Sequence, residues 1–181
     1  MNISLVGFMG SGKTVVGRKL AEKMGYDLVD TDDMVEEAAG KKISELFEKE
    51  GEEKFRELER KAVKKAGEMD KVVVSTGGGV VLSPENLANL RKNGPIVLLK
   101  VSAEKAFERV KGEKHRPLLA VNDPLARMKE LLEKRRTFYE LADYQVDTEG
   151  KTPEQIADEI HNLITSDSSA ALAESDSEAF E

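Results

Sequence analysis

The chain has 181 residues, of which 39 % are hydrophobic, and this suits one globular domain and excludes wholesale disorder. No apolar run reaches the roughly 18 residues of a membrane span, the N-terminus lacks the layout of a signal peptide, and the net charge of −7 argues against a broad nucleic-acid surface. Without cysteine, disulfides and thiolate metal sites are excluded, which fits a cytoplasmic protein.

The first predicted strand, Ile3–Val6, leads directly into a glycine-rich loop. Residues 7–14 read Gly-Phe-Met-Gly-Ser-Gly-Lys-Thr and match the phosphate-binding pattern G-x-x-x-x-G-K-[ST]. In such a loop the backbone N–H groups surround a phosphate chain, Lys13 supplies positive charge and the Thr14 hydroxyl ligates magnesium. Apolar residues at helical spacing follow as far as Met24, so the motif lies between a strand and a helix. The loop therefore predicts a protein that binds a magnesium nucleotide.

A group of aspartates follows the second predicted strand, Asp27–Asp30. In the run Asp30-Thr31-Asp32-Asp33, an extended backbone would place Asp30 and Asp32 on one face and direct Asp33 away. Carboxylates at this edge of a parallel sheet can hold magnesium or its waters, or accept a hydrogen bond from an acceptor hydroxyl. The other interpretation is that these aspartates only cap a helix that starts near Met34.

The third predicted strand, Val72–Ser75, follows a charge-dense helix predicted over Gly51–Met69. The strand runs into three consecutive glycines, Gly77, Gly78 and Gly79. Their bare backbone would allow a small polar substrate to approach N–H groups at the same sheet edge. A flexible turn is the alternative interpretation.

The last two predicted strands are Ile96–Val101 and Tyr144–Val146. Helix start signals lie between and after them, at Ser83-Pro84, at Asp123-Pro124 and in the capping box Thr152-Pro153-Glu154-Gln155. Five strands that alternate with helices predict a three-layer α/β domain with a parallel sheet, whose ligand crevice lies at the carboxyl ends of the strands.

Three arginines have distinctive sequence neighbours. They are candidate binding residues, because arginine offers a planar fork for a carboxylate or phosphate. Arg56 lies in Lys54-Phe55-Arg56-Glu57, and Arg135 opens the run Arg-Arg-Thr-Phe-Tyr. The pair Arg135-Arg136 leaves the register of this last motif open, although the four-residue spacing to Tyr139 favours Arg135. Arg116 lies in a segment of about 111–123 that combines glycine, charges and proline, which predicts a mobile lid over the transferred phosphate.

The chain divides into a predicted P-loop domain, residues 1–165, with substrate-binding helices at about 31–66, and a C-terminal tail. The tail, Ser166–Glu181, contains five acidic residues, no basic residue and no sustained apolar period. We therefore expect the tail to be disordered.

Taken in order, the motifs resemble the shikimate kinase family from Met1 to about Ile164. A phosphate loop is common to many enzymes, but six motifs in one order are specific. The matching pieces are Gly7 to Thr14, Asp30-Thr31-Asp32, Phe55-Arg56, Gly77-Gly78-Gly79, Arg116-Pro117-Leu118-Leu119 and Arg135 to Tyr139. The resemblance implies a monomeric kinase that transfers the γ-phosphoryl of ATP to the 3-hydroxyl of shikimate, a step toward aromatic amino acids. It also implies a fold similar to nucleoside monophosphate kinases, with strand order 2-3-1-4-5.

The resemblance further implies a role for each matching residue. Lys13, Asp32 and Arg116 would be catalytic, with Asp32 as the acceptor of the substrate proton. Mg²⁺ would be held by Thr14 directly and by Asp30 through water. Shikimate would be bound by Asp32, Arg56, Gly77, Gly78, Gly79 and Arg135. ATP would be bound by Gly10, Ser11, Gly12, Lys13, Thr14, Val15, Arg109, Arg116 and Pro153, with Arg109 and Pro153 flanking the adenine.

Two other classes of protein share the phosphate loop. Another small kinase, such as a gluconate or nucleoside monophosphate kinase, would lack the paired arginines and the triple glycine. A nucleotide-dependent switch would hydrolyse slowly without a small acceptor, and the chain contains no Asn-Lys-x-Asp guanine-reading motif. The paired arginines and the triple glycine therefore favour a shikimate kinase over another small kinase, and the missing guanine-reading motif argues against a switch.

Overall fold

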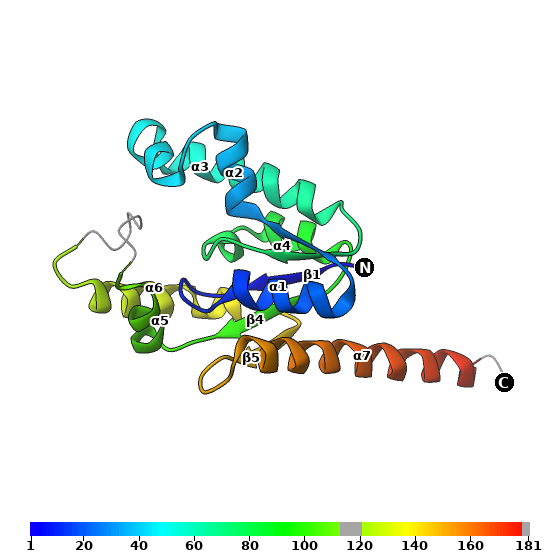
Figure 1. The fold of residues 1–181 in the computed structure, drawn as a ribbon. Helices are drawn as coiled ribbons and strands as arrows, with labels where there is room; N and C mark the ends of the chain where they lie inside the picture. Colours follow the sequence, from blue (N-terminus) through cyan, green and yellow to red (C-terminus); the bar gives the residue numbers. More distant parts are fainter. Residues whose placement is uncertain (113–120, 179–181) are drawn as a thin grey trace.

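The structure is a computed structural model that describes residues 1–112 and 121–178 (Figure 1). Strands and helices alternate along most of the chain. The elements are β1 (Ile3–Val6), α1 (Lys13–Met24), β2 (Asp27–Asp30), α2 (Thr31–Ala39), α3 (Ile43–Gly67), β3 (Val72–Ser75), the short 3₁₀ helix η1 (Val80–Leu82), α4 (Pro84–Arg91), β4 (Ile96–Lys100), α5 (Ala103–Val110), α6 (Pro124–Tyr139), β5 (Tyr144–Asp147) and α7 (Pro153–Glu178).

The five strands form one parallel sheet in the order β2-β3-β1-β4-β5, so the predicted fold class and strand order are confirmed. Strand positions also agree closely with the sequence patterns. The differences are one residue each: β4 ends at Lys100 rather than Val101, and β5 continues to Asp147. Both lie at strand ends, where a pattern of apolar residues defines the boundary least well.

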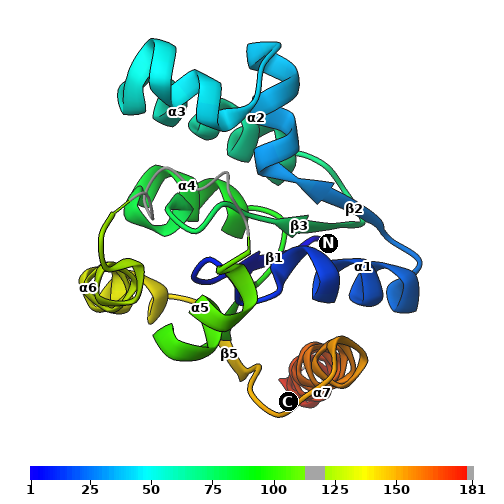
Figure 2. The same ribbon diagram turned by 60° about the vertical axis from the view of Figure 1, so that its left-hand side comes forward.

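Each face of the sheet carries its own apolar cluster, because successive side chains of a strand point to opposite faces. Ile3 and Leu5 pack with α1 and α7, whereas Val6 belongs to the cluster formed with α3, α4, α5 and α6. Figure 2 shows α1 and α7 together on one side of the strands. The two layers of helices hold the sheet rigidly and leave its carboxyl edge open for a site.

The predicted helix start signals are confirmed. Ser83 and Asp123 cap α4 and α6 by accepting hydrogen bonds from the N–H groups of Asn86 and Ala126. Thr152 and Gln155 form the capping box of α7. Helix α3 as a whole starts at Ile43, but Gly51 interrupts it with non-helical backbone at φ 83° and ψ 174°, so a second helical segment starts directly after Gly51, where the charge-dense helix was predicted. Among the described residues, no helix has both the length and the apolar character needed to cross a membrane.

The C-terminal segment differs from the expectation. Helix α7 does not end near Thr165 but continues through the acidic segment to Glu178, and it extends past the body of the domain in Figure 1. No glycine or proline follows Pro153, and the segment is rich in alanine, a strong helix former. The helix propensity of these residues therefore explains why α7 continues beyond the last apolar residue of its buried face.

We predict that deletion of residues 169–181 shifts the melting temperature by less than about 2 °C. The buried contacts of α7, at Ile156, Ala157, Ile160 and Ile164, all precede the deletion. The matched control is Ile160→Ala, which opens a cavity in the core and is expected to cost about 2–5 kcal/mol. A loss for the deletion comparable to that of Ile160→Ala would show that the acidic segment is part of the folded core.

Candidate functional site

A cleft of about 350 Å³ opens at the carboxyl ends of β1, β2 and β3. It is lined by most of the phosphate loop, by Asp30 and Asp32 after β2, by residues 75–78 at the end of β3 and by Arg109 of α5. This is the edge where the ligand crevice was predicted, because parallel strands place their carboxyl ends together.

The phosphate loop takes a conformation that depends on glycine. Gly10 has φ 75° and Gly12 has φ 90°, a region that other residues rarely adopt. A Cβ on Gly10 would also lie 2.8 Å from the Ala106 carbonyl oxygen. Helix α1 begins at Lys13, so its free N–H groups and the positive end of its dipole face the loop. The loop is thus built to hold an anion.

Lys13 lies over the same loop. Its Nζ donates hydrogen bonds to the Gly7 and Phe8 carbonyl oxygens at 2.8 and 3.0 Å and to Ser11 Oγ at 3.4 Å. The ammonium charge is therefore held within the loop, beside the backbone that would surround a phosphate.

Thr14, Asp30 and Ser75 bring three oxygen ligands together. The Thr14 hydroxyl donates to Asp30 Oδ2 at 2.9 Å and lies 3.1 Å from Ser75 Oγ. Hydroxyl and carboxylate oxygens suit a magnesium ion that keeps several waters and binds mainly through phosphates. The described residues contain no cluster of three or more His, Cys, Asp or Glu side chains that could hold a metal alone. Ser75 was not predicted as a site residue, although it is the last residue of β3 and therefore lies at the carboxyl edge of the sheet.

The extended conformation predicted for Asp30 and Asp32 is wrong, because α2 already begins at Thr31. Asp30 Oδ1 accepts a hydrogen bond from the Asp32 N–H at 2.9 Å and caps the helix, while its Oδ2 faces Thr14. Asp30 therefore caps α2, as the alternative interpretation predicted, and it also lines the cleft. Asp33 is exposed.

Asp32 lies against the first of the three glycines. A Cβ on Gly77 would be 2.8 Å from Asp32 Oδ1 and 3.3 Å from Glu59 Oε1, so a larger residue would displace these carboxylates. The Gly77 N–H also donates to Thr31 Oγ1 at 3.2 Å, which ties the first turn of α2 to the loop after β3. The triple glycine is thus a place of close approach, which a merely flexible turn would not require.

Arg56 of α3 reaches the third glycine. Its guanidinium would lie within 2.8 Å of a Cβ on Gly79. Arg56 Nη1 donates to both Glu59 oxygens, at 3.0 and 2.8 Å, and Nη2 to Glu52 at 3.2 Å. Only 2 % of the Glu59 side chain is exposed, and this burial raises its pKa, partly offset by the charges of Arg56 and Arg135. Glu59 was missed in the sequence, although its i,i+3 spacing from Arg56 on a helix is a usable signal.

Arg135 of α6 reaches the middle glycine. It is 6 % exposed, and its Nη1 donates to the Gly78 carbonyl oxygen at 3.3 Å. The neighbouring Arg136 is instead 64 % exposed and pairs with Glu133 and Glu140. The structure therefore brings Arg135, and not Arg136, to the triple glycine, next to the glycine that Arg56 contacts.

The remaining predicted residues lie less centrally. Arg109 donates to the Gly10 carbonyl oxygen at 2.9 Å and to Thr148 Oγ1 at 3.4 Å, and both Arg109 and Val15 line the cleft. Pro153 begins α7 but does not line the cleft. Arg116 and most of the predicted lid lie outside the described residues.

The strand order, with the phosphate loop directly after the central strand, defines a P-loop kinase. A gluconokinase from Sinorhizobium meliloti shares this fold at a TM-score of 0.60 and 19 % identity, over 91 % of this chain and 94 % of that one. The chain belongs to the shikimate kinase family, whose model matches residues 9–165.

Similar proteins of that family agree over nearly the whole chain. Shikimate kinase from Caldanaerobacter subterraneus subsp. tengcongensis is 52 % identical, covering 88 % of this chain and 93 % of the relative. Shikimate kinase from Thermodesulfovibrio yellowstonii is 50 % identical, with 88 and 92 % covered. The structure of shikimate kinase from Acinetobacter baumannii in complex with shikimate matches at a TM-score of 0.89 and 38 % identity, with 92 and 93 % covered. The function predicted from the motifs, an ATP-dependent kinase of shikimate, is confirmed, and the gluconate kinase alternative has only a distant structural neighbour.

We predict that Glu59→Gln lowers the free energy of unfolding by about 1–3 kcal/mol, because Arg56 then loses its buried countercharge. Glu52→Gln is the matched control, since Glu52 also pairs with Arg56 but is 63 % exposed, and we expect a change below about 1 kcal/mol. Chemical denaturation measures both. Equal effects of the two substitutions would contradict a structural role for the buried pair.

Proposed function

We propose that the triple glycine, together with Arg56 and Arg135, holds the carboxylate of shikimate while the phosphate loop holds ATP. The convergence of two arginines from different helices on one short backbone segment carries this proposal. Each guanidinium can present two parallel N–H groups to a carboxylate, which fixes the orientation as well as the charge. A chain with net charge −7 needs such a local concentration of cations to attract an anionic substrate.

ATP would lie along the phosphate loop. Backbone N–H groups of Gly10, Ser11 and Gly12 and the start of α1, with Thr14 and Val15, would surround its phosphates, and Lys13 would neutralise the β and γ oxygens. Arg109 would flank the adenine, which is supported by its place between the loop and Thr148. Pro153 as the other flank and Arg116 on the γ-phosphate stay predictions.

The metal that accompanies ATP would be Mg²⁺, held by the Thr14 hydroxyl directly and by Asp30 through water. The oxygen ligands support this choice, because Mg²⁺ prefers hard oxygen donors and retains water. When bound, the ion supplies neutralisation of the phosphate charge. The cytoplasmic location and the monomeric state also stay predictions.

The chemical step transfers one phosphoryl group. The 3-hydroxyl oxygen of shikimate attacks the γ-phosphorus, the bond to the β–γ bridging oxygen breaks, ADP leaves, and the hydroxyl proton passes to the Asp32 carboxylate. Asp32 lies against Gly77 and lines the cleft, so it would lie between the triple glycine and the phosphate loop. Holding both reactants in this alignment supplies much of the rate enhancement, because phosphoryl transfer needs position and charge stabilisation.

Arg135→Ala tests the carboxylate clamp. We expect the KM for shikimate to rise about tenfold to a hundredfold, as for a lost charged hydrogen bond, with the KM for ATP little changed. Arg136→Ala is the matched control, since the exposed neighbour does not reach the triple glycine. The measurement is ADP release at varied shikimate, with gluconate and AMP as alternative acceptors. An unchanged shikimate KM would refute the clamp, and stimulation by another acceptor would refute the substrate.

Asp32→Asn tests the proton acceptor. The amide keeps the size of the side chain but cannot take up the proton, so we expect kcat to fall about 10²- to 10³-fold with the KM for ATP unchanged. The matched control is Asp33→Asn, in the exposed neighbour, where we expect kcat to stay near the wild-type value. If Asp32→Asn turns over as fast as the wild type, Asp32 is not the base.

A further inference from the structure

Tyr139, the last residue of α6, makes the shortest contact with the triple glycine. Its hydroxyl donates to the Gly78 carbonyl oxygen at 2.6 Å, and Arg135 Nη1 donates to the same oxygen at 3.3 Å. Both side chains are buried. Burial also raises the pKa of Tyr139 to about 12, so its hydroxyl stays protonated and can donate at any physiological pH.

The position of this carbonyl determines where the next N–H group points. The peptide that joins Gly78 to Gly79 is planar and trans, so its C=O and N–H groups point in opposite directions. When the carbonyl faces α6, the Gly79 N–H faces away from it. Gly79 itself lies against the Arg56 guanidinium, and no hydrogen bond among the described residues uses its N–H. Gly79 is buried, and a buried N–H without a hydrogen-bond partner is costly, so a ligand that accepts from it would be favoured.

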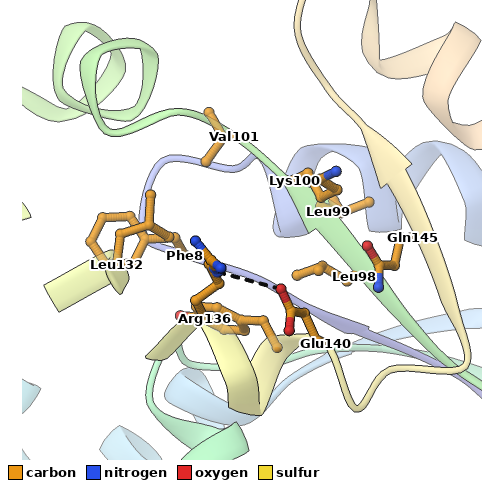
Figure 3. Close-up of a pocket in the computed structure, with 10 residues that line it drawn as sticks. Phe8, Leu98, Leu99, Lys100, Val101, Leu132, Arg136, Glu140 and Gln145 are labelled. Atoms are coloured by element: carbon orange, nitrogen blue, oxygen red, sulfur yellow. Dashed lines mark ion pairs between the residues drawn. The ribbon is translucent and has the colours of Figure 1, made fainter. Parts of the chain in front are cut away.

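Backbone N–H groups hold the carbonyls of Gly77 and Gly79, whereas side chains hold the carbonyl of Gly78. Three glycines in sequence leave the backbone unusually free. The Tyr139 side chain borders a cavity of about 260 Å³ between α6 and strands β4 and β5. Figure 3 shows Phe8, Leu98 and Leu132, which also line this cavity. The Tyr139 ring itself is packed in the core, so the hydroxyl has a defined place from which its hydrogen bond holds the Gly78 carbonyl.

We propose that Tyr139 is a positioning residue for the substrate carboxylate. Its hydroxyl fixes the Gly78–Gly79 peptide so that the Gly79 N–H donates to the carboxylate held between Arg56 and Arg135. The inference rests on the carboxylate clamp proposed above and adds the residue that sets the backbone donor of that clamp. Tyr139 does not line the cleft of the phosphate loop, so its effect should fall on shikimate binding.

The test is Tyr139→Phe, which removes the hydroxyl and keeps the ring in the cavity wall. We expect the KM for shikimate to rise about fivefold to twentyfold, while kcat and the KM for ATP change less than about twofold. The control is Tyr144→Phe: Tyr144 bonds Asp167 on α7, away from the cleft, and its loss should leave all three constants unchanged. An unchanged shikimate KM in Tyr139→Phe, or an equal rise in the KM for ATP, overturns the proposal.

A substrate analogue distinguishes positioning from general loosening of the fold. In the analogue a hydroxymethyl group replaces the carboxylate of shikimate. If Tyr139 acts through the carboxylate, Tyr139→Phe should change the analogue's KM less than about twofold, because the interaction it supports is already missing. An equal rise for shikimate and for the analogue would mean that the hydroxyl only stabilises α6, and it would overturn the proposal.

The clamp variant Arg135→Ala, assayed beside Tyr139→Phe, separates the two hypotheses. If Arg135→Ala raises the shikimate KM and Tyr139→Phe does not, the clamp stands and the role of Tyr139 is wrong. If neither variant changes it, the clamp itself is wrong and the proposal for Tyr139 falls with it. Melting curves of both variants verify that the compared proteins are folded at the assay temperature.

Discussion

The parallel pairing of β2, β3 and β1 is the constraint on which the site depends. It places three short segments at one edge: the phosphate loop after β1, the aspartates after β2 and the glycines after β3. No segment makes a site alone. In the proposed site the loop would supply anion-binding N–H groups, the aspartates oxygen ligands and a proton acceptor, and the glycines room for the substrate. A sheet of another order would separate these three functions.

The same edge solves an electrostatic problem. A carboxylate and a triphosphate repel each other, yet they must meet within a chain of net charge −7. The protein places Arg56 and Arg135 against the triple glycine and Lys13 in the phosphate loop, so in the proposed site each anion would have its own cations. Burial alone would make the guanidiniums costly, and the nearly buried Glu59 offsets this cost for Arg56.

Apolar runs followed by glycine or aspartate made the strands and the cleft predictable, since strand ends and turn residues leave local signals. The start of α2 was not predictable, because Asp30 suits an extended strand and a helix cap equally well. The four-residue spacing to Tyr139 favoured Arg135 over Arg136, because residues at i and i+4 share a helix face, and both Arg135 and Tyr139 indeed contact Gly78. Glu59 was missed because glutamate in a charge-dense helix usually faces solvent. The extent of α7 was missed because the segment lacks an apolar face although its residues favour a helix.

Asp30 uses its two carboxylate oxygens for two different elements. One oxygen caps α2, the helix that carries Asp32, and the other accepts the hydrogen bond of Thr14 beside the phosphate loop. If this carboxylate rotates toward a ligand in the phosphate loop, its hydrogen bond to the start of α2 therefore changes as well. Thermodynamic linkage requires the reverse effect to be of equal size. In the proposed site the two substrate subsites thus share one side chain, through which the free energy of binding at each would depend on the occupancy of the other.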